Sequence, residues 1–209
     1  ANDIYVTQSG ASLDLDITQD GQNNTVGNSS TSSASVGATT ILNIDQIGNS
    51  NVITYQIQGA TYTGVINLVG NSNNVDLNCD STGNNSSCGT ANAVINFTGN
   101  SNDIDLDIGQ TSSANTADVD IVGQSGSDSN VVAATVDGNS AILTITINGD
   151  TNNYLIDIDG NGDINGHTLI HSHTGGTADV DIVQSGINDQ YINLTTSGDN
   201  HDIDIQQTD

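Results

Sequence analysis

The clearest pattern along the chain is an alternation of apolar and polar residues, interrupted at intervals by short polar runs that contain glycine. Between Ile44 and Gly70 the alternation has a period of two, which is typical of a β-strand with one buried face. Gly48, Gly59 and Gly70 follow one another at a spacing of eleven residues, and Asn and Ser accompany them at the turns. The segment therefore predicts strand, turn, strand, turn, with one pair of strands in about 22 residues.

The same register recurs along most of the chain. Residues 3–10 and 14–21 both end in Gln-x-Gly, residues 92–108 repeat the strand–turn–strand pattern, and TADVDIV stands at both 116–122 and 177–183. Repeated strand pairs of this length predict an all-β solenoid with two facing parallel sheets. We expect one domain over residues 1–209, with roughly nine coils of about 22 residues each.

Four segments depart from the register and are expected to be irregular insertions. They lie near residues 28–40, 79–90, 111–116 and 161–176. The first is rich in Ser, Thr and Gly, and its pattern is compatible with either a long loop or a weak polar strand pair.

Composition supports the all-β prediction. The chain has no Lys, Arg, Glu, Pro, Met or Trp, so nearly every strong polar helix former is missing. Ile, Val and Thr favour strands, and Asn, Asp, Ser and Gly favour turns. A formal charge of −25 with low hydrophobicity is typical of disorder, but the apolar residues here are phased rather than scattered.

The charge also restricts the partners. A chain without a cationic side chain cannot neutralise phosphates, so neither nucleic acid nor an anionic membrane surface is an expected partner. No apolar run approaches the ~18 residues that cross a bilayer, so membrane insertion is not expected. The sequence starts at Ala1 and contains no Met, which suggests a removed signal peptide and a secreted protein. Cys79 and Cys88 flank a polar loop, and we favour a disulfide over a metal site.

Amide side chains recur at equivalent places near the turns. In a solenoid, such side chains can stack into ladders from coil to coil, although turn propensity alone also explains Asn and Gln at these places. The candidates for ladder and turn positions are Gln8, Gln19, Asn24, Gln46, Gly48, Asn51, Gly59, Gly70, Gln124, Asn130 and Gln184.

The motif Gln-x-Gly-x-x-Asn is intact at residues 19–24 and 46–51, and looser forms begin at Gln8, Gln124 and Gln184. This motif resembles the curlin repeat of the bacterial curli major subunit. The resemblance implies a secreted β-solenoid that stacks end to end into extracellular amyloid-like fibres of a biofilm matrix. The chain departs from the curlin unit in its insertions, its cysteine pair, its lack of Lys and Arg, and in Ile53 where curlin has Ala.

Aspartates alternate with Ile, Leu and Val on many predicted strands, so their carboxylates point outward when the apolar residues face the core. Stacked coils would align them into columns of like charge, for which Ca²⁺ is a suitable counter-ion. A solvated, solubilising face is the alternative interpretation. The candidate cation ligands are Asp103, Asp105, Asp107, Asp118, Asp120, Asp179 and Asp181.

Other candidate chemistry is sparse. His167, His171 and His173 lie close enough to chelate a transition metal, but histidines in a surface loop are the favoured interpretation. No nucleophile–base–acid arrangement is recognisable, so an enzyme is not expected and no cofactor is required.

The expected function is that of a structural subunit of an extracellular filament. No Lys, Pro or evident cap protects the terminal coils, so their strand edges are expected to join copies head to tail. The alternative is a monomeric solenoid binding module, either an ice-binding protein or part of an adhesin or phage fibre shaft.

Overall fold

The computed structural model describes residues 2–21, 23–27, 33–48, 51–70, 72–79, 87–99, 101–109, 116–124, 126–138, 140–159, 167–186 and 190–208. All regular structure in these residues is β-strand. They include no helix that is long and apolar enough to cross a membrane.

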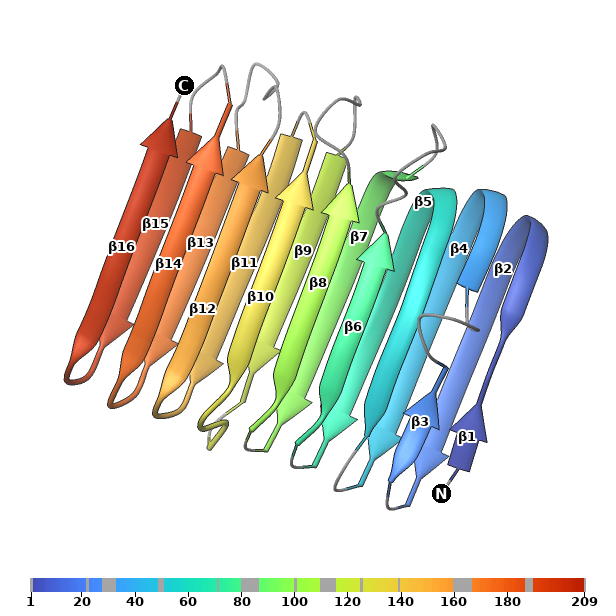
Figure 1. The fold of residues 1–209 in the computed structure, drawn as a ribbon, viewed down its shortest axis with the longest axis horizontal. Helices are drawn as coiled ribbons and strands as arrows, with labels where there is room; N and C mark the ends of the chain where they lie inside the picture. Colours follow the sequence, from blue (N-terminus) through green and yellow to red (C-terminus); the bar gives the residue numbers. More distant parts are fainter. Residues whose placement is uncertain are drawn as a thin grey trace.

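The strands form two sheets that face each other, as Figure 1 shows. The front sheet contains β1 (Asn2–Ile4), β3 (Asn24–Val26), β6 (Asn74–Cys79), β8 (Asp103–Gly109), β10 (Val131–Asp137), β12 (Asn152–Asp159), β14 (Ala178–Ser185) and β16 (His201–Thr208). The back sheet contains β7 (Ser87–Thr98), β9 (Thr116–Gly123), β11 (Ser140–Asn148), β13 (His167–Thr174), β15 (Gln190–Ser197) and the second parts of β2 (Thr7–Asp20) and β4 (Ser33–Ile47). The first parts of β2 and β4 lie in the front sheet, because Thr7 pairs with Ser33, Ser33 with Gln56 of the next coil, and Gln56 with Asn78 of β6.

Like β2 and β4, the long strand β5 (Val52–Val69) belongs to both sheets. Its first part pairs with β6 in the front sheet, and its second part pairs with β7 in the back sheet. The register shifts between Gly59 and Thr61, where the strand rounds the upper corner of the coil (Figure 1). The shift lets one continuous strand change sheets, since a bulge bends the strand that carries it.

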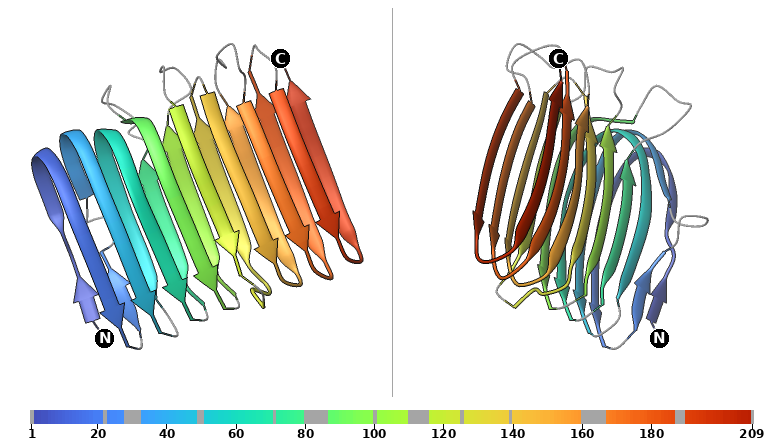
Figure 2. Two further views of the ribbon diagram at one scale, coloured as in Figure 1. Left: turned by 180° about the vertical axis from the view of Figure 1, so that it is seen from behind. Right: turned by 60° about the vertical axis from the view of Figure 1, so that its left-hand side comes forward.

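All strand pairs are parallel, so each coil lies directly on the preceding one and the fold is the predicted β-solenoid. The offset between paired residues is 22 in the pair Thr39↔Thr61 and 29 in the pair Asn74↔Asp103. Coils are therefore longer on average than the predicted 22 residues, because the additional residues lie at the corners between strands. The N-terminus and C-terminus lie at opposite ends of the stack (Figure 2).

The core fills the space between the sheets. Inward residues stack in columns, and one column contains only isoleucine in six successive coils: Ile17, Ile44, Ile66, Ile95, Ile121 and Ile145. β-branched side chains pack well on a pleated surface, and each buried one contributes about 1.5–3 kcal/mol relative to an exposed one. The column explains why the apolar residues are regularly spaced along a sequence of low overall hydrophobicity: this spacing brings them together in the core.

The irregular segments are shorter than the sequence predicted. Residues 33–40 belong to β4, residues 87–90 to β7 and residues 167–174 to β13. The remainder of the four segments lies largely outside the described residues. In β13 the polar sequence conceals a regular strand, and in β4 it conceals a strand whose register shifts between Ser35 and Thr39, because neighbouring coils on both sides supply the hydrogen bonds.

Candidate functional site

The lower corner of the coil is a short turn that leads from the back sheet to the front sheet (Figure 1). Several turns read Gly-x-x-Asn, as at residues 21–24, 48–51, 70–73, 99–102 and 149–152. The third position has a left-handed backbone with φ between 58° and 63°: Asn23, Ser72, Ser101, Ser129, Thr151 and Asn200. This conformation is uncommon outside glycine, so the corner imposes its geometry on these residues.

Glycine at the first turn position permits the close approach of successive coils. A Cβ atom on Gly48 would lie 1.8 Å from the carbonyl oxygen of Gly21, and one on Gly198 would lie 1.4 Å from that of Gly175. Real Cβ atoms do not approach an oxygen so closely. Of the predicted glycines, Gly48 and Gly70 occupy this turn position, whereas Gly59 lies within β5.

The last turn position carries a column of buried asparagines. The Oδ1 atom of Asn102 accepts the backbone N–H and the Nδ2 amide of Asn73, at 3.1 and 3.0 Å. Asn130 accepts the same two bonds from Asn102, at 2.9 and 3.1 Å, and Asn152 accepts them from Asn130, both at 3.0 Å. Each side chain therefore ties its coil to the next one.

A third bond closes the turn within each coil. The Nδ2 atom of Asn102 donates to the carbonyl of Gly99 at 2.7 Å, and that of Asn152 donates to Gly149 at 2.9 Å. One amide thus links two coils and caps its own turn. The sequence predicts ladder positions at Asn24, Asn51 and Asn130 but not at Asn73, Asn102 and Asn152, although the spacing Gly-x-x-Asn identifies these last three.

The column ends before the last coils. Asn152 pairs in register with Ala178, and Ala178 pairs with His201. It is also weaker near the N-terminus, where the backbone N–H of Asn24 donates to Oδ1 of Asn51 at 3.3 Å and Nδ2 of Asn51 has no partner among the described residues.

The predicted glutamines do not form one column. Gln46 donates from Nε2 to Oε1 of Gln19 at 2.6 Å inside the core, while Gln184 accepts a bond of 3.1 Å from Gln207 at the other end. Gln124 is exposed beside a lower turn. The backbone of Gln8 lies in β2, and its side chain is outside the described part of the chain.

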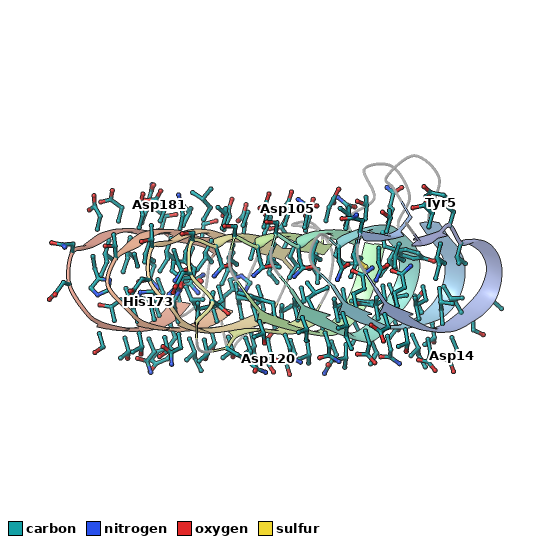
Figure 3. All side chains as sticks on the ribbon, turned by 90° about the horizontal axis from the view of Figure 1, so that it is seen from below. Tyr5, Asp14, Asp105, Asp120, His173 and Asp181 are labelled. Carbon is teal, nitrogen blue, oxygen red and sulfur yellow. The ribbon has the colours of Figure 1, made fainter. Side chains whose placement is uncertain are left out.

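The aspartates point outward from both sheets. Figure 3 shows Asp14 and Asp120 on one side of the solenoid and Asp105 and Asp181 on the other. They do not form continuous columns of charge, because other residues separate them. Asp103 lies between Asn74 and Val131, Asp107 between Asn78 and Thr135, Asp118 between Asn92 and Ile142, and Asp120 between Val94 and Thr144.

Aspartates do meet in register at a few places, which are Asp76 with Asp105, Asp137 with Asp159, Asp179 with Asp202, and Asp181 with Asp204. Partial burial raises the pKa of Asp105, and the negative charges of Asp76 and Asp103 raise it further. Asn78 relieves the charge elsewhere by donating from Nδ2 to Asp107 at 3.1 Å. Within the described residues, no group of three or more His, Cys or Asp side chains is placed to hold a metal ion.

Cys79 faces the core in β6 and is disulfide-bonded, and Cys88 is the other cysteine of the chain. Cys88 lies in β7, and its side chain is outside the described residues.

The histidines of β13 are not in a surface loop, so that interpretation of the sequence was wrong. His167, His171 and His173 all point inward and are fully buried. Figure 3 shows His173 between the two sheets. The sequence His-Thr-Leu-Ile-His-Ser-His-Thr indicates this burial. The three histidines are each an even number of residues from buried Leu169, so they lie on the same face of the strand.

The two ends of the stack differ. In the last front strand, Ile203 and Ile205 are 38% and 49% exposed, although they are in register with the buried Val180 and Ile182. At the other end, the inward side chains of Leu13 and Ile17 are only 8% and 5% exposed. The C-terminal coil, formed by β15 and β16, therefore presents apolar core positions together with two strand edges that have no neighbour in the described chain.

No family model, curated protein or solved structure matches the chain. The fold alone therefore defines its class, which is that of parallel two-sheet β-solenoids.

Proposed function

We propose that this protein is the structural subunit of a secreted, curli-like filament of the cell surface or biofilm matrix, in which copies join head to tail. The observation that carries the proposal is the C-terminal coil. Its strand edges and its core positions are both open, and a further coil of the same geometry would cover them. Head-to-tail contacts of this kind produce open fibres.

A second copy is the occupant that fits this surface. The columns that end at Ile203 and Leu194 begin, at the other end of the chain, with Ile4 and Ile17. Continuation of the stack would thus place apolar residues against apolar residues and pair two parallel strand edges. The disulfide at Cys79 supports a location in an oxidising compartment such as the cell exterior.

Cross-linking tests both assembly and register. Asp16 and Asn193 are exposed outward residues of the first and last back strands and belong to one column. In a filament that continues the stack, a chain with Asp16→Cys and Asn193→Cys would bring these cysteines within the 4.4–6.8 Å Cα separation of a disulfide. We expect long covalent ladders in non-reducing electrophoresis and unbranched filaments in electron micrographs.

The matched control pairs Asn193→Cys with Asp20→Cys, which is displaced by four residues along the same strand and would not cross-link. Monodisperse particles in the micrographs of the unmodified protein would refute the filament. Filaments that cross-link equally with both cysteine pairs would support assembly but would contradict the proposed strand register between copies.

One observation favours a monomeric ice-binding module as the second candidate. Thr39, Thr61 and Thr90 stack in one outward column, which the sequence pattern did not indicate. The adjacent column contains Ile41, Thr63 and Asn92 and lacks a second row of threonines. Thermal hysteresis of the monomer would support this function, and its loss in Thr61→Leu would locate the surface.

A further inference from the structure

All four histidines of the chain lie in its last coils, close to the proposed assembly surface. Three of them, His167, His171 and His173, line the inner face of β13, and His201 opens β16. Since β13 pairs directly with the edge strand β15, the histidines lie immediately beneath the C-terminal coil.

His171 interrupts the isoleucine column. It pairs with Ile145 on one side and with Leu194 on the other, so an apolar side chain is the regular occupant of this position. Neither ring nitrogen of His171 has a hydrogen-bond partner among the described residues. A buried N–H without a partner destabilises the folded state. His171 is therefore less favourable for stability than the apolar residue that occupies this position in the neighbouring coils. Such departures are expected at functional positions.

The rings of His171 and His173 contact Tyr154, and that of His173 also contacts His201, whereas Nδ1 of His167 accepts the backbone N–H of Ala141 at 3.2 Å. The ring of Tyr154 lies edge-on to His171 with centroids 4.3 Å apart, and its hydroxyl is 2.9 Å from Nδ1 of His173. His173 contacts His201 across the interior, with centroids 5.3 Å apart. Burial and His201 lower the pKa of His173, and the carboxylate of Asp150 acts against these larger effects by raising it.

The other strands around the cluster contribute no charge. Inward residues next to it are Ile145 and Ile147 from β11, Val180, Ile182 and Gln184 from β14, and Leu194 and Thr196 from β15. A proton on His171 therefore creates a buried cation beside apolar side chains, and a second proton on His173 adds repulsion to it.

We propose that the histidine cluster makes the C-terminal assembly surface acid-labile, so that protonation opens β13, β15 and β16 and stops the addition of further copies. This inference rests on the proposed function, because it concerns the control of the same surface.

The sign of the effect follows from burial. Desolvation, assisted by His173, lowers the pKa of His171 from 6.5 to about 4 in the folded state. The open state therefore binds the proton more tightly, and the folded state loses stability as the pH falls from 6.5 towards 4. At pH 5, opening around His171 alone becomes about 20-fold more favourable than at pH 7.

The aspartates act in the opposite direction. Burial raises the pKa of Asp105 and of Asp157, so these carboxyls take up protons more readily in the folded state than in the open one. Acid also reduces the repulsion between outward aspartates. The histidine effect is therefore best isolated between pH 7 and pH 5 by comparison of variants.

Hydrogen exchange of the monomer is the first test, after correction for the intrinsic pH dependence of exchange. Between pH 7 and pH 5 we expect amides of β13, β15 and β16 to lose at least tenfold in protection, while those of β5 and β7 change less than twofold. The variant His171→Ile should retain its protection, and Leu169→Ile, an inward change on the same strand, should behave like the unmodified protein. Unchanged protection in β13 and β15 of the unmodified protein would overturn the proposal.

Elongation of preformed seeds is the second test. We expect the rate to fall at least tenfold from pH 7 to pH 5 in the unmodified protein and less than threefold in His171→Ile. A parallel fall in both proteins would overturn the proposal. If no filament forms at any pH, the proposed function fails, while the exchange measurement still determines whether the cluster responds to protons.

Discussion

Single residues at the lower corner set how closely two coils approach. Glycine at the first turn position allows close contact with the preceding carbonyl, although Ser127 takes this position in one coil, and asparagine at the last position supplies bonds both within and between coils. Among the described middle positions, Ser72, Ser101 and Thr151 are exposed. The corner therefore combines a steric requirement with a hydrogen-bonding one.

Gly48→Ala should destabilise the monomer by about 3 kcal/mol or more, because its Cβ would overlap the carbonyl of Gly21 and a coil would have to shift. The matched control is Gly126→Ala. Gly126 also has a positive φ of 82° but has open space around its Cα, so its substitution should cost only about 1 kcal/mol of backbone strain. Urea denaturation followed by circular dichroism measures both. Equal costs would show that the close approach is unimportant.

Asn102→Ala should cost about 2–4 kcal/mol of unfolding free energy, because it removes the acceptor for Asn73 and the donor to Gly99 in a buried corner. The control Asn92→Ala concerns an exposed residue on the outer face of β7 and should change stability by less than about 0.5 kcal/mol. A loss for Asn102→Ala no greater than that of the control would contradict a stabilising asparagine column.

Among the elements, β13 shows how tertiary context overrides composition. Its sequence is rich in His and Thr, yet it is a regular strand with inward histidines, because β11 and β15 pair with it on both sides. The backbone of the polar first half of β4 is likewise a strand, because it lies between β2 and β5, with a register shift between Ser35 and Thr39.

His171→Ile should raise the unfolding free energy at pH 7.5 by about 1–3 kcal/mol, because isoleucine completes the apolar column and removes an unpartnered N–H. It should also flatten the loss of stability between pH 6.5 and pH 4, since the lowered pKa of His171 causes part of that loss. Chemical denaturation over this pH range gives both values. A less stable variant at pH 7.5 would show that the imidazole has an essential packing role.

For the whole molecule, the decisive features are the open C-terminal coil and the net charge of −25. Charge opposes the approach of two copies, whereas strand edges and apolar core positions favour it. Salt weakens the repulsion over distances beyond the Debye length of about 10 Å at 0.1 M, so assembly should accelerate with ionic strength.

Calcium should act beyond ionic strength if cations bridge aspartates of neighbouring coils. At matched ionic strength we expect calcium to raise the melting temperature of the unmodified protein by about 2–4 °C relative to a chelator, corresponding to about 1 kcal/mol. The variant Asp179→Asn with Asp202→Asn removes one pair in register and should lose part of this increase. Identical melting temperatures in calcium and in chelator would contradict cation bridging and would support the interpretation of the aspartates as a solvated surface.

The alternation of apolar and polar residues was sufficient to predict an all-β solenoid, and the recurring glycine turns were sufficient to predict that coils stack in parallel. Both are local signals, because a strand buries every second residue and a turn needs residues that tolerate positive φ. The resemblance to the curlin repeat, and the filament it implies, stays a prediction.

Other properties depended on which residues lie beside one another in successive coils. Corner lengths vary, so only the folded chain shows that Asn73, Asn102, Asn130 and Asn152 form one column, that most predicted aspartate columns are interrupted, and that the C-terminal coil is open. The sequence by itself determined the strands and their buried faces, because these depend on neighbours along the chain. Tertiary structure decided the columns, the burial of the histidines and the character of the ends, because register between coils is set by contacts across distances of 22 to 29 residues.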